Sequence, residues 1–174
     1  MSIRVAPVRD EHIPRVLKLL DIGLREEAVF AAQCDPPEDD GFLEAEIVEH
    51  RDALHARRDE WVVALDSSDS VVGVLWIRFN VDPVGPYGSV RQIIVDPARR
   101  RRGIGTLLLR YAEDQIRAAD SAFFLISAFR TNPAWKLYRS LGFSNFPDEF
   151  KEDKNPEHVV LWKPLRELAR PQTS

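Results

Sequence analysis

The sequence has little of what several classes of protein require. Its single cysteine, Cys34, cannot form a disulfide within the chain, and its four histidines have no metal-ligand spacing, so we expect no metal site. The most apolar run, from Val71 to Phe79, is too short to cross a bilayer as a helix. Positive charge is not in excess, because the net charge is −4 at pH 7. We therefore expect neither nucleic acid nor a membrane among the partners.

The first residues contain no apolar segment of the kind found in a secretory signal, so the expected location is the cytoplasm. Of the 174 residues, 44% are hydrophobic and 30% are charged, which is typical of a folded chain and not of a disordered one. This length suits a single domain. We expect the domain to cover residues 1–165 and a frayed tail to follow over 166–174.

Hydrophobic spacing predicts a sheet flanked by helices. Apolar residues three and four apart predict helices that begin near Ile13, Phe42, Ile104 and Pro133. Short apolar or alternating runs predict strands over residues 3–8, 61–65, 71–80, 89–95, 122–128 and 158–163. The stretch 82–88, rich in proline and glycine, predicts a loop. The order of these elements is typical of an α/β or α+β domain.

The most informative segment is a strand, a basic turn and a helix between Val90 and Leu109. The N–H groups at the start of a helix lack partners within the helix, and the helix dipole favours negative charge there. Gly103 and Gly105 have no side chain to block a close approach to these amides, so a phosphate or diphosphate can bind them. The neighbouring side chains of Arg100, Arg101 and Arg102 would add positive charge for phosphate oxygens.

Of the other interpretations of this turn, two are excluded by the sequence, one stays open and one is disfavoured. The dinucleotide-binding fingerprint needs a third glycine where Leu108 stands, and the P-loop lysine is absent, so both motifs fail. A simple strand–helix turn with solvated arginines stays open on these residues alone. A basic patch for nucleic acid is disfavoured by the acidic surroundings.

The order of two motifs adds to this reading. Arg100-x-x-Gly103-x-Gly105 is followed by a helix, a strand and the segment Leu137-Tyr138-Arg139-Ser140-Leu141-Gly142-Phe143. Together these motifs resemble the Gcn5-related N-acetyltransferase superfamily over about residues 71–143. The resemblance implies one mixed, mostly antiparallel sheet with a splayed pair of parallel strands, flanked by helices. It also implies an enzyme that transfers an acetyl group from acetyl-CoA to a small-molecule or peptide amine. Because members of this family are often dimers, a homodimer is compatible with it.

The resemblance also implies roles for individual residues. Backbone groups around Ile94 and Val95 would bind the pantetheine arm, and an N–H near Val95 would stabilise the oxyanion. The cofactor diphosphate would lie on amides of the turn and helix start, formed by Arg101, Arg102, Gly103, Ile104, Gly105 and Thr106. Tyr138 would be the general acid for the departing thiolate, because a phenol of pKa about 10 can protonate a thiolate whose acid has a pKa of about 8.5. The alternative for Tyr138 is a core side chain on the buried helix face.

Two positions depart from the family pattern. Thr131 stands where relatives often have an asparagine, so the neighbouring Asn132 either contacts the cofactor or only caps the helix. Arg91 and Gln92 occupy the strand where many relatives have a glutamate that serves as the base. No base can therefore be assigned, since Asp96 before a proline suits a turn better.

The missing strand glutamate supports an alternative function, an acyl-CoA-binding regulatory module without turnover. The choice of acceptor amine also stays open. An acidic stretch over residues 35–40 either attracts a cationic amine or is a solvated loop.

Overall fold

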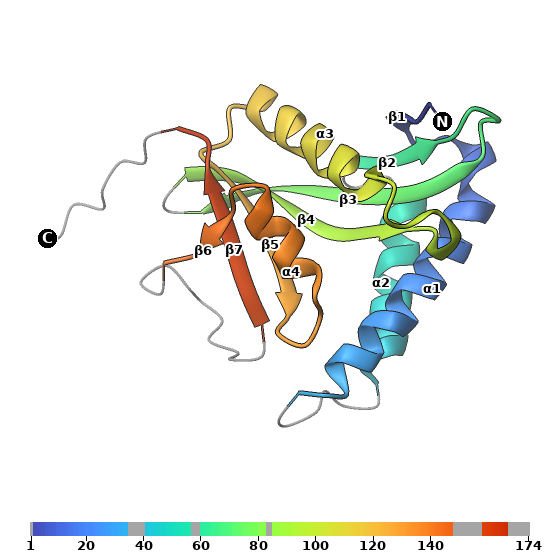
Figure 1. Ribbon diagram of the computed structural model, residues 1–174, viewed down its shortest axis with the longest axis horizontal. Coiled ribbons are helices and arrows are strands. Elements are labelled where there is room, and N and C mark those ends of the chain that lie inside the picture. Colours follow the sequence, from blue (N-terminus) through green and yellow to red (C-terminus); the bar gives the residue numbers. More distant parts are fainter. Residues whose placement is uncertain (1, 35–40, 57–59, 83–84, 148–157, 167–174) are drawn as a thin grey trace, which may run out of the picture.

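In the computed structural model, the described residues form one sheet of seven strands in the order β1-β2-β3-β4-β5-β7-β6 (Figure 1). The structure describes residues 2–34, 41–56, 60–82, 85–147 and 158–166. Neighbouring strands are antiparallel except β4 and β5, which are parallel. The strands are β1 (Arg4–Pro7), β2 (Glu60–Leu65), β3 (Val71–Asp82), β4 (Gly85–Val95), β5 (Phe123–Phe129), β6 (Ser144–Asn145) and β7 (His158–Pro164). This arrangement confirms the predicted fold class.

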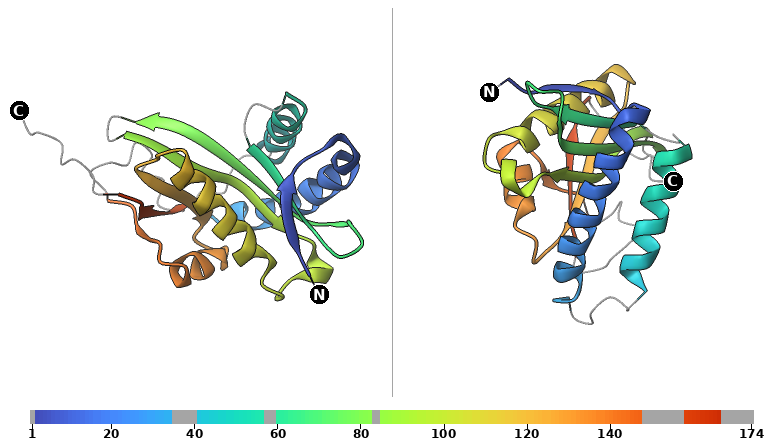
Figure 2. Two further views of the ribbon diagram at one scale, coloured as in Figure 1. Left: turned by 90° about the horizontal axis from the view of Figure 1, so that it is seen from above. Right: turned by 90° about the vertical axis from the view of Figure 1, so that its right-hand side faces the viewer.

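In the described part of the chain, α-helices cover both faces of the sheet (Figures 1 and 2). They are α1 (Ile13–Ala31), α2 (Phe42–Ala56), α3 (Ile104–Ala118) and α4 (Ala134–Ser140). Helices α1 and α2 pack on one face, around Leu19, Leu54 and the stacked rings of Trp61 and Trp76. Helices α3 and α4 pack on the other face, which buries Leu108, Ile116, Phe124 and Tyr138. Helices α1 and α3 bury most of the apolar stripe that their sequences predict, whereas Leu137 of α4, expected on the buried face, is 37% exposed.

Strand β4 begins earlier than the sequence predicts. The prolines and glycines of residues 82–88 predict a loop, but the strand starts at Gly85. Residues Tyr87 to Val90 pair with β3 on one side and with β5 on the other. The carbonyl of Pro86 also accepts a hydrogen bond from the N–H of Ala122, at 2.6 Å. Pairing with two neighbours outweighs the weak strand preference of these residues.

The parallel pair β4–β5 separates partway along its length. Pairing runs from Tyr87–Phe123 to Val90–Ile126 and ends there, although both strands continue. At the same level the β3–β4 register shifts, because Trp76 pairs with Gln92 and Ile77 pairs with Val90. Arg91 is therefore the extra residue of a β-bulge, a feature that bends a strand. The bend carries the end of β4 away from β5, which opens the sheet as the family resemblance implies.

The predicted tail lies outside the described residues, except for Arg166 at its start. Within the described ranges, no helix combines the length and the apolar character needed to cross a membrane.

Candidate active site

A cavity of about 1240 Å³ occupies the opening between the separated ends of β4 and β5. Its walls come from β4, β5, the start of α3, one side of α1, and α4. The sequence-predicted residues meet here from three segments of the chain: Ile94, Val95, Arg100, Arg101, Gly103, Ile104, Gly105, Thr106, Asn132 and Tyr138 all line the cavity. Arg102, which was also predicted, is exposed to solvent and does not line the cavity.

The N-terminus of α3 presents backbone N–H groups at one end of this cavity. Gly103 adopts φ +79° at the N-cap, and Arg101 has φ +62°, a left-handed conformation that is uncommon outside glycine. The backbone ladder of α3 starts with the N–H of Leu107, which donates to the Gly103 carbonyl at 3.0 Å. The N–H groups of the preceding residues come before that ladder, so they suit an anion.

The arginines of the turn differ in their environments. Arg100 donates through Nε to the carbonyl of Val95 at 3.1 Å and forms an ion pair with Glu26 of α1 at 2.6 Å. Arg100 therefore links the turn to α1 across the cavity. Arg101 lines the cavity.

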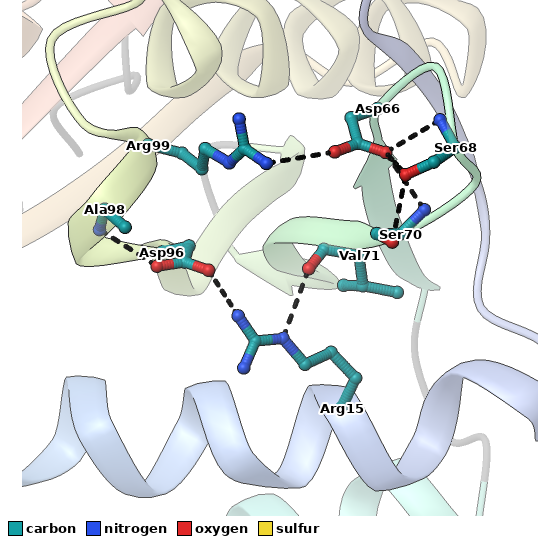
Figure 3. Close-up of polar contacts among 8 residues, drawn as sticks. All are labelled: Arg15, Asp66, Ser68, Ser70, Val71, Asp96, Ala98 and Arg99. Carbon is teal, nitrogen blue, oxygen red and sulfur yellow. Dashed lines mark hydrogen bonds and ion pairs between the residues drawn. The ribbon is translucent and has the colours of Figure 1, made fainter.

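A polar network behind the turn fixes it to α1 and to the β2–β3 connection (Figure 3). The Asp96 carboxylate accepts a hydrogen bond from the N–H of Ala98 at 2.9 Å and pairs with Arg15, which also donates to the Val71 carbonyl at 3.3 Å. Arg99 reaches Asp66 at 3.4 Å. Hydrogen bonds from the side chain and backbone of Ser68 lower the pKa of Asp66. Asp96 therefore serves the turn, as its position before a proline indicates.

The free edge of β4 turns one backbone donor toward the opening. The N–H of Asp96 donates to the carbonyl of Val72 in β3, at 3.0 Å. Backbone groups alternate in direction along a strand, so the N–H of Val95 points away from β3, toward the side that β5 has left. Ile94 pairs with Val74 of β3, so its backbone is already used by the sheet.

Tyr138 reaches the cavity from α4, on the face of the sheet that α3 covers. Its side chain packs with Phe143, and only 5% of the residue is exposed. Burial raises the pKa of the hydroxyl, and the negative charge of Glu27 raises it further. No described residue forms a hydrogen bond with this hydroxyl. Tyr138 is thus both a core residue and part of the cavity wall, which combines the two interpretations of its sequence position.

Asn132 lies where the chain enters α4. Its Oδ1 accepts a hydrogen bond from the N–H of Ala134 at 2.9 Å, so the side chain caps the helix. The residue also lines the cavity. A cofactor contact through the side-chain amide N–H groups stays a prediction.

The cavity contains a carboxylate, that of Glu27, which lies on α1, a helix whose sequence contains no functional motif. Glu27 of α1 accepts a hydrogen bond from Nε2 of Gln92 at 2.9 Å, while Oε1 of Gln92 accepts from the N–H of Ile93 at 3.0 Å. Burial raises the pKa of Glu27, which the hydrogen bond from Gln92 and the charges of Arg91 and His158 partly offset. Gln92 is thereby held at both ends of its amide and directs one N–H at Glu27.

The close contact between α1 and β4 explains how Glu27 reaches Gln92. A Cβ built on Gly23 would lie 2.5 Å from Cγ1 of Ile94, so only glycine lets the helix approach this strand. Residues 23 and 27 share one helix face, and residues 92 and 94 share one strand face. The helix that meets Ile94 at Gly23 therefore meets Gln92 one turn later, at Glu27.

We expect Gly23→Ala to destabilise the fold by about 1–3 kcal/mol, because the new methyl group overlaps the buried Ile94 side chain. Urea unfolding measures this difference. Gly105→Ala is the matched control for stability, since a Cβ there would meet its nearest atoms at an ordinary 3.8 Å. Equal unfolding free energies for Gly23→Ala and the wild type would contradict the contact.

The cavity also contains titratable residues from other elements that were not predicted from the sequence. Glu46 comes from α2, Lys136 from α4, and His158 from the first position of β7. Burial raises the pKa of Glu46, while Arg91 lowers it. Among the described residues, no three histidine, cysteine, aspartate or glutamate side chains form a metal site.

Two solved structures that superpose on this chain carry acetyltransferase names. The PaiA N-acetyltransferase from Thermoplasma acidophilum, in complex with coenzyme A, superposes with a TM-score of 0.68 over 94% of this chain and 99% of its own, at 14% identity. A second structure, from Corynebacterium glutamicum, is described as histone acetyltransferase HPA2 and related acetyltransferase. It superposes with a TM-score of 0.68 over 99% of this chain and 100% of its own, at 23% identity. The likeness to both structures shows that this chain has their fold.

The chain belongs to the acetyltransferase (GNAT) family, whose model matches residues 25–143. This result confirms the resemblance drawn from the glycine turn and the Tyr138 segment. The chain is also 34% identical over 99 residues to a curated IAA acetyltransferase from Azospirillum brasilense, a match that covers 56% of this chain. It spans 63% of that protein, less than two thirds of its length.

Proposed function

We propose that this protein transfers the acetyl group of acetyl-CoA to a primary amine of a small molecule or peptide. One observation is central: β4 and β5 separate after Val90 and Ile126, beside the start of α3. The resulting cavity has backbone N–H donors at one end and the Tyr138 hydroxyl in its wall. These features suit a thioester attached to a diphosphate.

The residues present fit such a donor. The amides from Arg101 to Thr106 would bind the diphosphate, and Arg101 would add positive charge. Val95 offers its N–H on the free strand edge, where it would bind the pantetheine arm or the carbonyl oxygen. The thioester supplies an acyl carbon that an uncharged amine can attack.

The chain's groups have separate tasks in this reaction. The amine nitrogen forms a bond to the acyl carbon, and the Val95 N–H stabilises the negative charge that develops on oxygen. The carbon–sulfur bond breaks as Tyr138 donates its proton to sulfur. An alkyl ammonium loses two protons on becoming an amide and the thiolate gains one, so one proton in total reaches solvent.

Titration calorimetry with acetyl-CoA, followed by a thiol-release assay with a panel of amines, tests this function. We expect saturable acetyl-CoA binding and thiol release that depends on the amine. Absence of acetyl-CoA binding would refute the proposal. Binding with no release for any amine would instead support the regulatory module.

A further inference from the structure

The two faces of the sheet provide different groups to the opening. Tyr138 approaches from the face covered by α3 and α4, and Glu27 approaches from the face covered by α1 and α2. Both line the same cavity, and the charge of Glu27 acts on Tyr138. A thioester in the opening would therefore have a proton donor on one side and a carboxylate on the other.

Building on the proposed acetyl transfer, we propose that Glu27 is its catalytic base and takes the proton of the acceptor ammonium, while Gln92 is the positioning residue that holds the carboxylate. The Glu27 carboxylate is half-buried and accepts the Gln92 amide at 2.9 Å. Gln92 is itself oriented by the Ile93 N–H at 3.0 Å. The strand thus lacks a carboxylate of its own but holds the one that α1 provides.

The surroundings of Glu27 determine how it titrates. Arg91 of β4 and His158 of β7 favour its charged form, whereas Glu46 of α2 is a further carboxylate nearby. Burial has the largest effect and raises the pKa of Glu27 above the ordinary value of a glutamate. A base is more effective as its pKa approaches the working pH.

The proton transfer defines the class of acceptor. An alkyl amine resembling lysine has a pKa of about 10.4, so it enters mostly as an ammonium at neutral pH. Glu27 accepts one N–H proton, leaving a lone pair that attacks the acyl carbon, and then releases the proton to solvent. Such a base is needed for an alkyl amine and not for an amine that is already neutral.

Glu27→Gln tests the assignment, because it keeps the shape and the hydrogen bond to Gln92 but cannot accept the proton. We expect kcat/KM for an alkyl amine at pH 7 to fall about 100-fold to 10,000-fold. Acetyl-CoA binding should stay within about threefold of the wild-type value, because the general-base role adds nothing to it. Glu44→Gln, the same change on the exposed side of α2, is the matched control.

The pH profile separates a base from a structural residue. The wild-type rate should fall as pH drops through the pKa of Glu27, because a protonated carboxyl cannot accept a proton. In Glu27→Gln this limb should vanish, and the rate should rise with pH up to the pKa of the amine. A Glu27→Gln enzyme with the wild-type rate and profile would overturn the assignment.

Gln92→Glu provides a second test on the partner. A second carboxylate at hydrogen-bond distance raises the apparent pKa of the pair. We expect the acid limb of kcat/KM to move to higher pH, and an unmoved limb would overturn the positioning role. These results are distinct from a failure of the proposed function, in which the wild-type protein itself would release no thiol.

Discussion

Tyr138→Phe is expected to lower kcat by about 100-fold or more while acetyl-CoA binds as tightly as before. The substitution removes one hydroxyl oxygen and keeps the ring that packs on Phe143, so the core should stay intact. A thiol-release assay measures kcat, and calorimetry measures the affinity for acetyl-CoA. Tyr111→Phe is the control, because Tyr111 packs on the same core from α3 without lining the cavity.

The raised pKa of Tyr138 gives this prediction a direction in pH. Burial and the charge of Glu27 keep the hydroxyl protonated throughout the neutral range. Loss of rate through ionisation of Tyr138 should therefore appear only above its ordinary pKa of about 10. When Glu27 takes a proton, the charge that raises the pKa of Tyr138 disappears, so the acid becomes stronger after the base has acted. An unchanged kcat in Tyr138→Phe would exclude the general-acid role.

Gly105→Asp is expected to weaken acetyl-CoA binding by about 100-fold or more without destabilising the fold. The new carboxylate would occupy the anion position at the start of α3 and repel a diphosphate. The same charge suits a helix N-terminus, where it contributes about 0.3–1 kcal/mol. A Cβ at this position has room, with its nearest atoms at 3.8 Å.

Calorimetry and thermal unfolding together test the Gly105→Asp prediction. Ala118→Asp adds the same charge at the other end of α3, so it should leave acetyl-CoA binding unchanged and lower stability slightly. If Gly105→Asp bound acetyl-CoA like the wild type, the diphosphate would have to lie elsewhere.

Local sequence patterns predicted the helices and the turn well. The helices begin close to the predicted positions, and glycines with left-handed φ of +79° and +89° stand at the start of α3 (Gly103) and at the end of α4 (Gly142). Prediction was poorer for the first half of β4, where proline and glycine indicate a loop. Its strand pairing comes from β3 and β5, and β5 is over thirty residues away along the chain.

The proposed base shows where sequence reasoning reaches its limit. Glu27 stands among other charged residues of α1 and belongs to no motif. Its place depends on Gly23 meeting Ile94, a contact between segments about seventy residues apart. A glycine in the middle of an amphipathic helix could have indicated a close approach, but not which strand it meets.

The spacing between two contacts of helix α1 fixes where Glu27 lies. Arg15 near its start holds the turn through Asp96, and Glu27 lies twelve residues further along, about 18 Å at 1.5 Å per residue. One inserted residue between these two positions would rotate Glu27 by about 100° around the axis and leave the helix itself intact. The length of this segment is therefore under tighter constraint than the identity of most residues within it.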